Sequence, residues 1–212
     1  EGVKRIRFMT SHPKDLSDKL IYTIRDCGKI CKQLHLPFQA GSDKVLKDMN
    51  RHYDKKRYLE IIDKVKSEIP GIALTTDVIV GFPTETNEDF RETLDVLRRV
   101  RFDSIFSFIY SRREGTPAAK LEPVLSDEEI HRNFDELLEL QNAICKEKNL
   151  EYVGREEEVL IDGASKTDRE MMSGRTDSRK IVNFRAPGKK PGEYVNVKIT
   201  RAKQWSLEGE LL

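Results

Sequence analysis

The run Ile72-Ala73-Leu74-Thr75-Thr76-Asp77-Val78-Ile79-Val80 decides the fold class of this chain. Its residues are nearly all apolar or β-branched, which is typical of a strand in a parallel sheet that is buried on both faces. Gly81-Phe82-Pro83-Thr84 ends the strand, and the apolar residues of 54–68 before it follow the 3.6-residue period of a helix. The stretch therefore predicts a helix followed by a buried strand.

The same arrangement recurs along the first half of the chain. Four strand-like runs are each followed directly by a polar stretch; the runs are 5–9, 34–38, 72–80 and 102–110, and the stretches are Thr10–Pro13, Gln39–Ser42, Gly81–Thr84 and Ser111–Arg113. Helices are predicted between the runs, at 16–26 with Gly28 as a C-cap, after Ser42, at 54–68, and after a capping pair of Thr86 and Asp89. This alternation predicts an α/β fold with a parallel sheet, barrel or part-barrel and right-handed crossovers. Polar residues that follow parallel strands gather on one face, where such folds place their chemistry.

The character of the chain changes near residue 150. Ser126 and Glu129 form a capping box that begins a helix running to about Leu150. Short strand-like runs separated by Gly, Pro and Asp then follow, at 158–161, 179–184, 194–200 and 205–211. This spacing is typical of a small all-β barrel. We therefore expect two domains, 1–150 and 151–212.

The second domain carries an excess of positive charge. Between Ser165 and Gln204 the chain has eleven Lys or Arg residues and four Asp or Glu residues, an excess of seven positive charges. Such an excess on a small barrel favours nucleic acid, because neutralised phosphates release counterions. The aromatic rings of Phe184, Tyr194 and Trp205 either stack on unpaired bases or belong to the core.

Composition excludes several other classes of protein. The chain has 212 residues, of which 37% are hydrophobic, and a net charge of +1. No apolar run reaches the roughly eighteen residues of a membrane span, and no signal peptide is recognised, so we expect a cytoplasmic protein. Three cysteines argue against a disulfide framework and for a reducing compartment. The chain begins in mid-strand without Met, which suggests a piece of a longer protein.

Cys27, Cys31 and His35 have a metal-like spacing, but a fourth ligand is not evident. Ordinary reduced thiols are the default interpretation, and we assign no metal ligand. Cys145 stands alone in a helical pattern and is expected to pack.

Several strings together carry a family resemblance. They are residues 5–13 (RIRFMTSHP), 35–42 (HLPFQAGS) with 49–51 (MNR), 75–83 (TTDVIVGFP) and 110–118 (YSRREGTPA) in the first domain, and 173–176 (SGRT), 182–184 (VNF) and 199–202 (ITRA) in the second. In this order they resemble the radical S-adenosylmethionine methylthiotransferases, in the tRNA-modifying, MiaB-type branch. The second domain resembles the family's RNA-binding TRAM barrel. The string HLPFQA at 35–40 favours the tRNA branch over the branch that modifies a ribosomal protein.

The resemblance implies a six-stranded partial barrel that binds S-adenosylmethionine and a [4Fe-4S] cluster, with a second cluster in an amino-terminal domain. The family installs a methylthio group on an N6-isopentenylated adenosine beside the tRNA anticodon. The family's C-x3-C-x2-C cluster motif is absent here, since Leu34 stands where a third cysteine would follow Cys27 and Cys31. The chain is therefore expected to hold barrel strands three to six plus the TRAM domain, without the amino-terminal part, and to be inactive alone.

The resemblance and the residue chemistry suggest where the cofactor binds. Gln39, Ser42, Arg51, Asp77 and Gly81 are the expected contacts to S-adenosylmethionine. Arg51 would hold its carboxylate, and Asp77 must face the barrel lumen or a partner, because an unpaired buried charge is costly. For Ser42 an N-cap, for Arg51 a surface salt bridge and for Gly81 a plain turn remain open alternatives. No catalytic residue is assigned.

The expected tRNA contacts come from both domains. In the first they are Ser11, His12, Arg112 and Arg113, with loop stabilisation or solvated charge as the alternative. In the second they are Arg175, Arg179, Lys180, Lys198, Arg201 and Lys203.

Two other functions stay open on the sequence alone. One is a stand-alone RNA-binding protein with a non-catalytic α/β scaffold. The other is an unrelated α/β-barrel enzyme in which residues 81–86 bind the phosphate of a metabolite. The exposed edge of the first predicted strand also suggests self-association through strand pairing.

Overall fold

The computed structural model describes residues 2–8, 12–165, 168 and 170–212. Two compact units make up the chain. One comprises Glu1–Arg7, Lys29–Gln33 and Asn142–Leu212, and the other comprises Phe8–Gly28 and Leu34–Gln141. Two short segments from the beginning of the chain therefore group with the carboxy-terminal residues.

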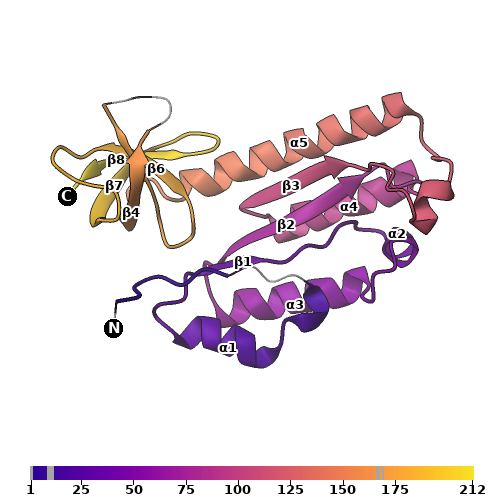
Figure 1. The fold of residues 1–212 in the computed structure, drawn as a ribbon, viewed down its shortest axis with the longest axis horizontal. Coiled ribbons are helices and arrows are strands. Elements are labelled where there is room, and N and C mark those ends of the chain that lie inside the picture. The colour runs from indigo at the N-terminus through magenta and orange to yellow at the C-terminus, as the bar shows by residue number, and fades with distance from the viewer. Residues whose placement is uncertain (1, 9–11, 166–167, 169) are drawn as a thin grey trace. The chain divides into compact units, whose positions relative to one another are not determined.

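The second unit is built on a three-stranded sheet. Strands β1 (Gln33–His35), β2 (Ala73–Val80) and β3 (Ser104–Ile109) lie in that order (Figure 1). β2 and β3 are parallel, with Asp77 opposite Phe106 and Ile79 opposite Phe108. The sequence prediction of an α/β fold with a parallel sheet is confirmed.

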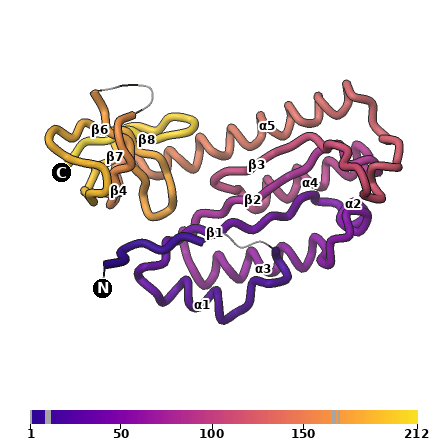
Figure 2. Tube along the Cα trace, in the orientation of Figure 1, coloured from indigo at the N-terminus to yellow at the C-terminus, as the bar shows by residue number. Residues whose placement is uncertain are grey.

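Within the part of the chain that the structure describes, five helices accompany the sheet in the order that Figure 2 traces by colour. They are α1 (Asp18–Asp26), α2 (Asp43–Asp48), α3 (Lys55–Glu68), α4 (Asn87–Val100) and α5 (Asp127–Leu150), and single 3-10 turns occur at Pro13–Asp15 and Pro117–Lys120. Helices α1 and α3 pack side by side, and ion pairs join Asp18 to Lys64 and Arg25 to Glu68.

Side-chain caps begin most of these helices, as the sequence predicts. Thr86 and Asp89 form a complete capping box at α4, and Ser126 and Glu129 exchange the same pair of hydrogen bonds at α5. Asp54 caps α3 by accepting a hydrogen bond from a backbone amide. The predicted end of the first helix at Asp26 is confirmed, but its C-cap is Cys27 rather than Gly28, and the helix begins at Asp18 instead of Leu16.

The two faces of β2 differ, so the prediction of a strand buried on both faces is wrong. Leu74, Thr76, Val78 and Val80 are buried, while the alternate residues from Thr75 to Ile79 are half-buried. On β3, the parallel partners Phe106 and Phe108 are 48% and 55% exposed. Residues two apart share one face of a strand. Asp77 and Ile79 therefore share an open face with two phenylalanines.

The strand predicted at 5–9 is also wrong over its described residues. Ile6 forms one isolated parallel bridge with Ile30, and no ladder extends from it in the described part of the chain. Arginine side chains, rather than a strand ladder, hold this segment in its unit: Arg5 and Arg7 donate to the backbone carbonyls of Arg175 and Thr176. The self-association expected at that strand edge therefore loses its structural premise.

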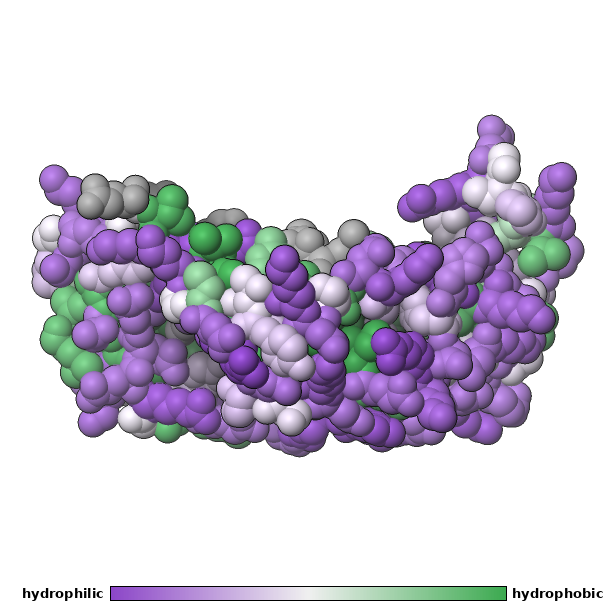
Figure 3. Space-filling model, turned by 90° about the horizontal axis from the view of Figure 1, so that it is seen from below, coloured by the Kyte–Doolittle hydropathy of each residue, from purple (hydrophilic) through white to green (hydrophobic). Residues whose placement is uncertain are grey.

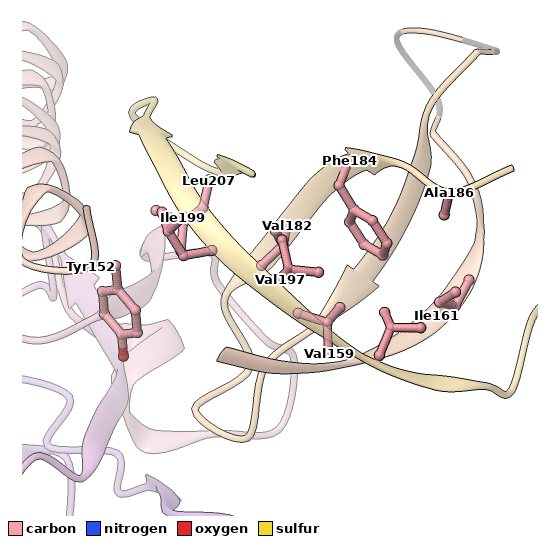
Figure 4. Packing of buried hydrophobic residues seen from close by; sticks show 10 residues of the cluster. Tyr152, Val159, Ile161, Val182, Phe184, Ala186, Val197, Ile199 and Leu207 are labelled. Carbon is pink, nitrogen blue, oxygen red and sulfur yellow. The ribbon is translucent and has the colours of Figure 1, made fainter. Parts of the chain in front are cut away.

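The carboxy-terminal residues form a closed five-stranded barrel. Its strands are β4 (Glu156–Ala164), β5 (Met172–Arg175), β6 (Ile181–Arg185), β7 (Tyr194–Ala202) and β8 (Leu207–Leu211), in the order β4-β5-β6-β8-β7. Figure 4 shows Val159, Val182, Phe184 and Val197 pointing toward one another inside the barrel.

The sequence prediction of a small all-β barrel is confirmed, but β5 is missed. Its sequence, Met-Ser-Gly-Arg, has little β propensity. A Cβ atom at Gly174 would lie 2.4 Å from the carbonyl oxygen of Leu160 on the neighbouring strand. The absence of a side chain at Gly174 therefore lets the backbones of β4 and β5 approach closely. The pattern of apolar and β-branched residues does not reveal this requirement.

On the surface drawn in Figure 3, hydrophilic side chains predominate and hydrophobic ones show only in separate patches. Among the described residues, no helix combines the length and apolar character of a membrane span.

Candidate functional site: a cavity beside the parallel sheet

A cavity of about 740 Å³ opens where the strands of the parallel sheet end. This volume suits a cofactor-sized molecule. The lining residues come from four segments of the second unit, namely Gln39, Asp48–Arg51, the residues Asp77, Ile79 and Phe82 of β2 and its loop, and the residues 108–111, 113 and 116–118 of β3 and the loop after it. Of the predicted cofactor contacts, the structure brings Gln39, Arg51 and Asp77 together here.

Two non-glycine residues of the lining have left-handed backbones. Gln39 has φ = 67° and Asn50 has φ = 57°, values that are uncommon for residues with a side chain. Hydrogen bonds hold Gln39 in this conformation: its amide donates to the carbonyl of Asp77 (3.0 Å), and its carbonyl accepts from Ile79 (2.9 Å). Backbone strain of this kind clusters at functional sites.

Two buried polar atoms of the lining lack a partner. Nε of Arg51 and the hydroxyl of Tyr110 are inaccessible to water and form no hydrogen bond within the described residues. An unsatisfied buried donor costs about 1–3 kcal/mol. An acceptor supplied by a ligand, such as a carboxylate, would satisfy both groups, and the cation of Arg113 also lines the cavity.

The carboxylate of Asp77 is oriented by a histidine on the neighbouring strand. Nε2 of His35 lies 3.5 Å from Oδ1 of Asp77, and Nδ1 of His35 lies 3.0 Å from the hydroxyl of Thr75. The imidazole and the Phe106 ring form a T-shaped pair, with 5.8 Å between ring centroids. Asp77 therefore has a partner in His35 and also lines the cavity.

Ser42 and Gly81 are not brought into the cavity. Ser42 begins α2 but makes no side-chain cap; its hydroxyl donates to Oδ1 of Asp89 at 2.6 Å and is buried. Gly81 has φ = 75°, and a Cβ atom there would lie 2.7 Å from Cγ2 of Ile130. Gly81 thus permits the close packing of α5 rather than the approach of a ligand.

In the loop after β2, carboxyl groups of the chain itself accept hydrogen bonds from two backbone amides. The amide of Gly81 donates to Oε2 of Glu85 (2.6 Å), and the amide of Thr86 donates to Oδ2 of Asp89 (2.9 Å). These amides are therefore unavailable to an anion, and the alternative of a phosphate-binding loop at 81–86 is wrong.

Glu85 and Asp89 have opposite electrostatics. Burial raises the pKa of Glu85 to about 7, with Asp89 adding to the effect. Burial also acts to raise the pKa of Asp89, but hydrogen bonds from Lys44, Ser42 and Thr86 outweigh it and lower that pKa to about 2. The loop therefore holds one carboxylate that favours its proton and one that favours its charge.

The other predicted substrate contacts of the first half are placed differently. Ser11 lies outside the described residues. His12 accepts a hydrogen bond from the amide of Lys14, and its ring forms a T-shaped pair with Tyr53 (5.3 Å between centroids), so the structure shows it stabilising its loop. Arg112 pairs with Glu122, whereas Arg113 lines the cavity.

The predicted basic residues of the barrel fall into three groups. Lys180 is buried, with its ammonium over the ring of Tyr152, because the turn at 176–180 folds it inward. Arg175, Arg201 and Lys203 are ion-paired, with Asp162 in the first case and with Glu208 in the other two. The exposed Arg179 and Lys198 form no ion pair within the described residues, although Glu156 and Glu210 flank Lys198 across the strands. The accessible positive charge is thus smaller than the sequence count suggests.

The cysteines do not suit an iron–sulfur cluster. Burial and a hydrogen bond to Asp177 raise the pKa of the Cys31 thiol to about 11, which opposes the thiolate that metal binding requires. Cys145 is buried on α5, and no metal-suitable cluster of His, Cys, Asp or Glu occurs among the described residues.

Sequence reasoning missed several residues of the cavity. Tyr110, Phe108 and Asn50 line the cavity but are assigned no role from the sequence, and His35, which contacts Asp77, is considered there only as part of a metal-like spacing. The two-residue period of strands could have indicated which face of its strand each of Phe108 and His35 occupies. The unsatisfied hydroxyl of Tyr110 and the backbone of Asn50 have no sequence signal.

Comparisons with known proteins show what this chain is similar to. The profile of the radical SAM superfamily matches residues 1–97, and the profile of the TRAM domain matches residues 150–212. The E. coli coproporphyrinogen III oxidase HemN, described as a radical SAM enzyme, superimposes with a TM-score of 0.55 at 19% identity over 66% of this chain and 32% of its own. That likeness concerns the fold alone.

Curated relatives are much closer in sequence. The tRNA-2-methylthio-N(6)-dimethylallyladenosine synthase of Acetivibrio thermocellus is 55% identical over 211 residues, which are 100% of this chain and 44% of the relative. The synthase of the same name from Thermoanaerobacter pseudethanolicus is 56% identical over 212 residues, 100% of this chain and 45% of the relative. That from Clostridium botulinum is 51% identical over 210 residues, 99% of this chain and 47% of the relative.

The chain spans about half the length of the curated relatives it matches. The resemblance seen in the sequence motifs is confirmed by both profiles and by these identities. The chain therefore carries a stretch that matches the radical SAM superfamily and a TRAM domain, and over nearly its whole length it is similar to these synthases.

Proposed function

We propose that this chain is the carboxy-terminal portion of a cytoplasmic tRNA methylthiotransferase, which adds a methylthio group to N6-isopentenyladenosine beside the anticodon. In this proposal β1, β2 and β3 are strands four to six of the family's six-stranded partial barrel, residues 1–150 are its radical SAM portion, and residues 151–212 are its TRAM domain. The identity of 51–56% to synthases of that name over nearly the whole chain is the observation that carries it.

The cavity fits S-adenosylmethionine in its size and its polar groups. Arg51 and Tyr110 offer the two unsatisfied donors to the carboxylate of the cofactor, and Arg113 adds a second cation. Asp77, oriented by His35, offers an acceptor for the ammonium group or the ribose hydroxyls. Ile79, Phe82 and Phe108 supply apolar surface for the adenine.

When bound in a complete enzyme of this family, S-adenosylmethionine supplies a radical and a methyl group. The residues described here bind and orient that cofactor and limit water in the cavity. The [4Fe-4S] clusters of the family have no fitting ligands among the three cysteines, so no step is assigned to them in this chain.

Binding of S-adenosylhomocysteine to this chain, measured by isothermal titration calorimetry, tests the cavity assignment. A charge-assisted hydrogen bond contributes about 1.5–3 kcal/mol, so Arg51→Ala should weaken binding by about 10- to 150-fold. Arg57→Ala, which removes a largely exposed arginine of α3, is the matched control and should leave binding unchanged. Equal affinities of all three proteins would contradict the assignment.

The RNA part of the proposal has a separate test. Binding of a tRNA to this chain should weaken steeply as salt rises, because cations of the barrel displace counterions from phosphate. The purely RNA-binding alternative predicts the same salt dependence but no binding of the cofactor. The calorimetric result therefore separates these two functions.

A further inference from the structure

The β7–β8 turn of the barrel presents an exposed aromatic ring. Trp205, the only tryptophan of the chain, is 61% exposed at the tip of the loop 203–206. The other two aromatic candidates are not available in this way. Phe184 lies in the barrel core, and the half-buried ring of Tyr194 is covered by Lys4 and Arg5, each 5.0 Å from its centroid.

The backbone that carries this ring is held firmly. The amide of Lys203 donates to the carbonyl of Ser206 (2.8 Å), which closes the loop. Nδ2 of the buried Asn149, at the end of α5, donates to the carbonyls of both Lys203 (2.9 Å) and Gln204 (3.0 Å). A ring on a braced turn loses little conformational freedom when it binds a partner.

The immediate surroundings of the ring are cationic. Arg201 and Lys203 precede it and are largely exposed, and both pair with the same carboxylate, that of Glu208. Two cations share one acid, so these three side chains together carry a net positive charge close to Trp205 along the chain. A flat aromatic face next to ordered cations matches an unpaired base and its phosphate.

From these observations we propose that Trp205 is a stacking platform for an unpaired nucleobase of single-stranded or loop RNA, with Arg201 and Lys203 facing the adjoining phosphate. This inference rests on the proposed RNA function and adds to it the site and the kind of RNA that it takes. Paired bases offer no free face, so a duplex should not engage the ring.

The single tryptophan makes the test direct. Two RNAs of equal length are titrated into the whole chain, a hairpin with an unpaired loop and a fully paired duplex. Trp205 emission reports stacking, and the anisotropy of a label on the RNA independently reports binding. The hairpin should quench the emission, and the duplex should leave it nearly unchanged.

Variants of the turn complete the experiment. Trp205→Ala should weaken hairpin binding about tenfold, within the range that stacking of one base on an aromatic ring contributes, and should leave duplex binding unchanged. Trp205→Phe retains an aromatic face and should recover most of the affinity, which a folding defect would not allow. Gln204→Ala, at the neighbouring exposed residue, is the control and should behave as the unchanged chain.

Three results would overturn the inference. Hairpin binding seen by anisotropy without quenching, or with Trp205→Ala unimpaired, would refute the platform and leave the RNA function standing. If the wavelength of the Trp205 emission maximum shifts with protein concentration in the absence of RNA, the ring belongs to a protein–protein contact instead. Absence of binding to either RNA would overturn both the platform and the proposed RNA function.

Discussion

The buried carboxyl group of Glu85 gives a pH dependence of stability that can be worked out in advance. Its side chain is 1% exposed, Oε2 accepts the amide of Gly81, and Oε1 has no hydrogen-bond partner within the described residues. Burial raises its pKa from 4.5 to about 7. A tenfold change in proton affinity is worth about 1.4 kcal/mol, so the difference corresponds to about 3 kcal/mol.

The sign follows from proton binding. Between pH 4.5 and about 7 the folded chain keeps this proton while the unfolded chain loses it, so stability falls as pH rises through this window. The contribution is fully present below pH 4.5 and is lost above about pH 7. Glu85→Gln keeps an acceptor for Gly81 and cannot ionise. Relative to the unchanged chain, the variant should therefore gain about 3 kcal/mol as pH rises through this window.

Urea unfolding followed by far-ultraviolet circular dichroism, at several pH values across the window, measures this change. Glu88→Gln is the matched control, because the Glu88 side chain is 78% exposed in the first turn of α4, the helix that follows Glu85, and it should leave the pH profile unchanged. Carboxyl NMR should show Glu85 titrating near pH 7. A Glu85→Gln profile parallel to that of the unchanged chain would refute the reasoning.

Three further outcomes are expected. Gly81→Ala should destabilise the chain by about 2–5 kcal/mol, because the new Cβ atom would meet Ile130 and the backbone there is left-handed. Gly71→Ala is the control: its φ is also left-handed, at 78°, but the space around it is open, so the loss should be only about 1–2 kcal/mol. Equal losses in urea unfolding would contradict the packing role of Gly81. The lowered pKa of Asp89 stabilises the folded chain above pH 3.8, and this contribution is lost as pH falls toward 2. Asp89→Asn should therefore show no such loss between pH 3.8 and 2. An acid unfolding profile like that of the unchanged chain would contradict this expectation. Arg5→Ala should speed amide hydrogen exchange in the barrel strands, because it removes hydrogen bonds to two backbone carbonyls and one carboxylate, and unchanged exchange would show that this segment does not stabilise the barrel.

Much of the fold was predictable because its signals are local. The capping box of Thr86 and Asp89, the period of α3 and the β-branched run of β2 act over a few residues, and the structure confirms each of them. The prediction of a strand at 5–9 is wrong over the described residues, because a strand requires a hydrogen-bonded partner along its length. The β-branched and apolar character of a run does not show whether that partner is present.

The candidate site was predictable in part. Gln39 follows a parallel strand and Asp77 lies in one, and topology alone brings such residues to one edge of a sheet, whereas Arg51 comes after the short helix α2. Ser42 and Gly81 occupy equivalent places in the sequence, but their contacts are with Asp89 and Ile130, far away along the chain. Such long-range contacts decide whether a residue that follows a strand points into the cavity or away from it.

The sequence by itself determined the α/β order, the barrel that follows it and the resemblance to the methylthiotransferases, because periodicity, caps and motifs depend on neighbouring residues. Only the tertiary structure decided which donors remain unsatisfied, which cations are already paired, and that Trp205 alone of three aromatic candidates presents an open face. These properties depend on distances between residues remote in sequence, since burial and pairing are set by the whole surroundings of a group.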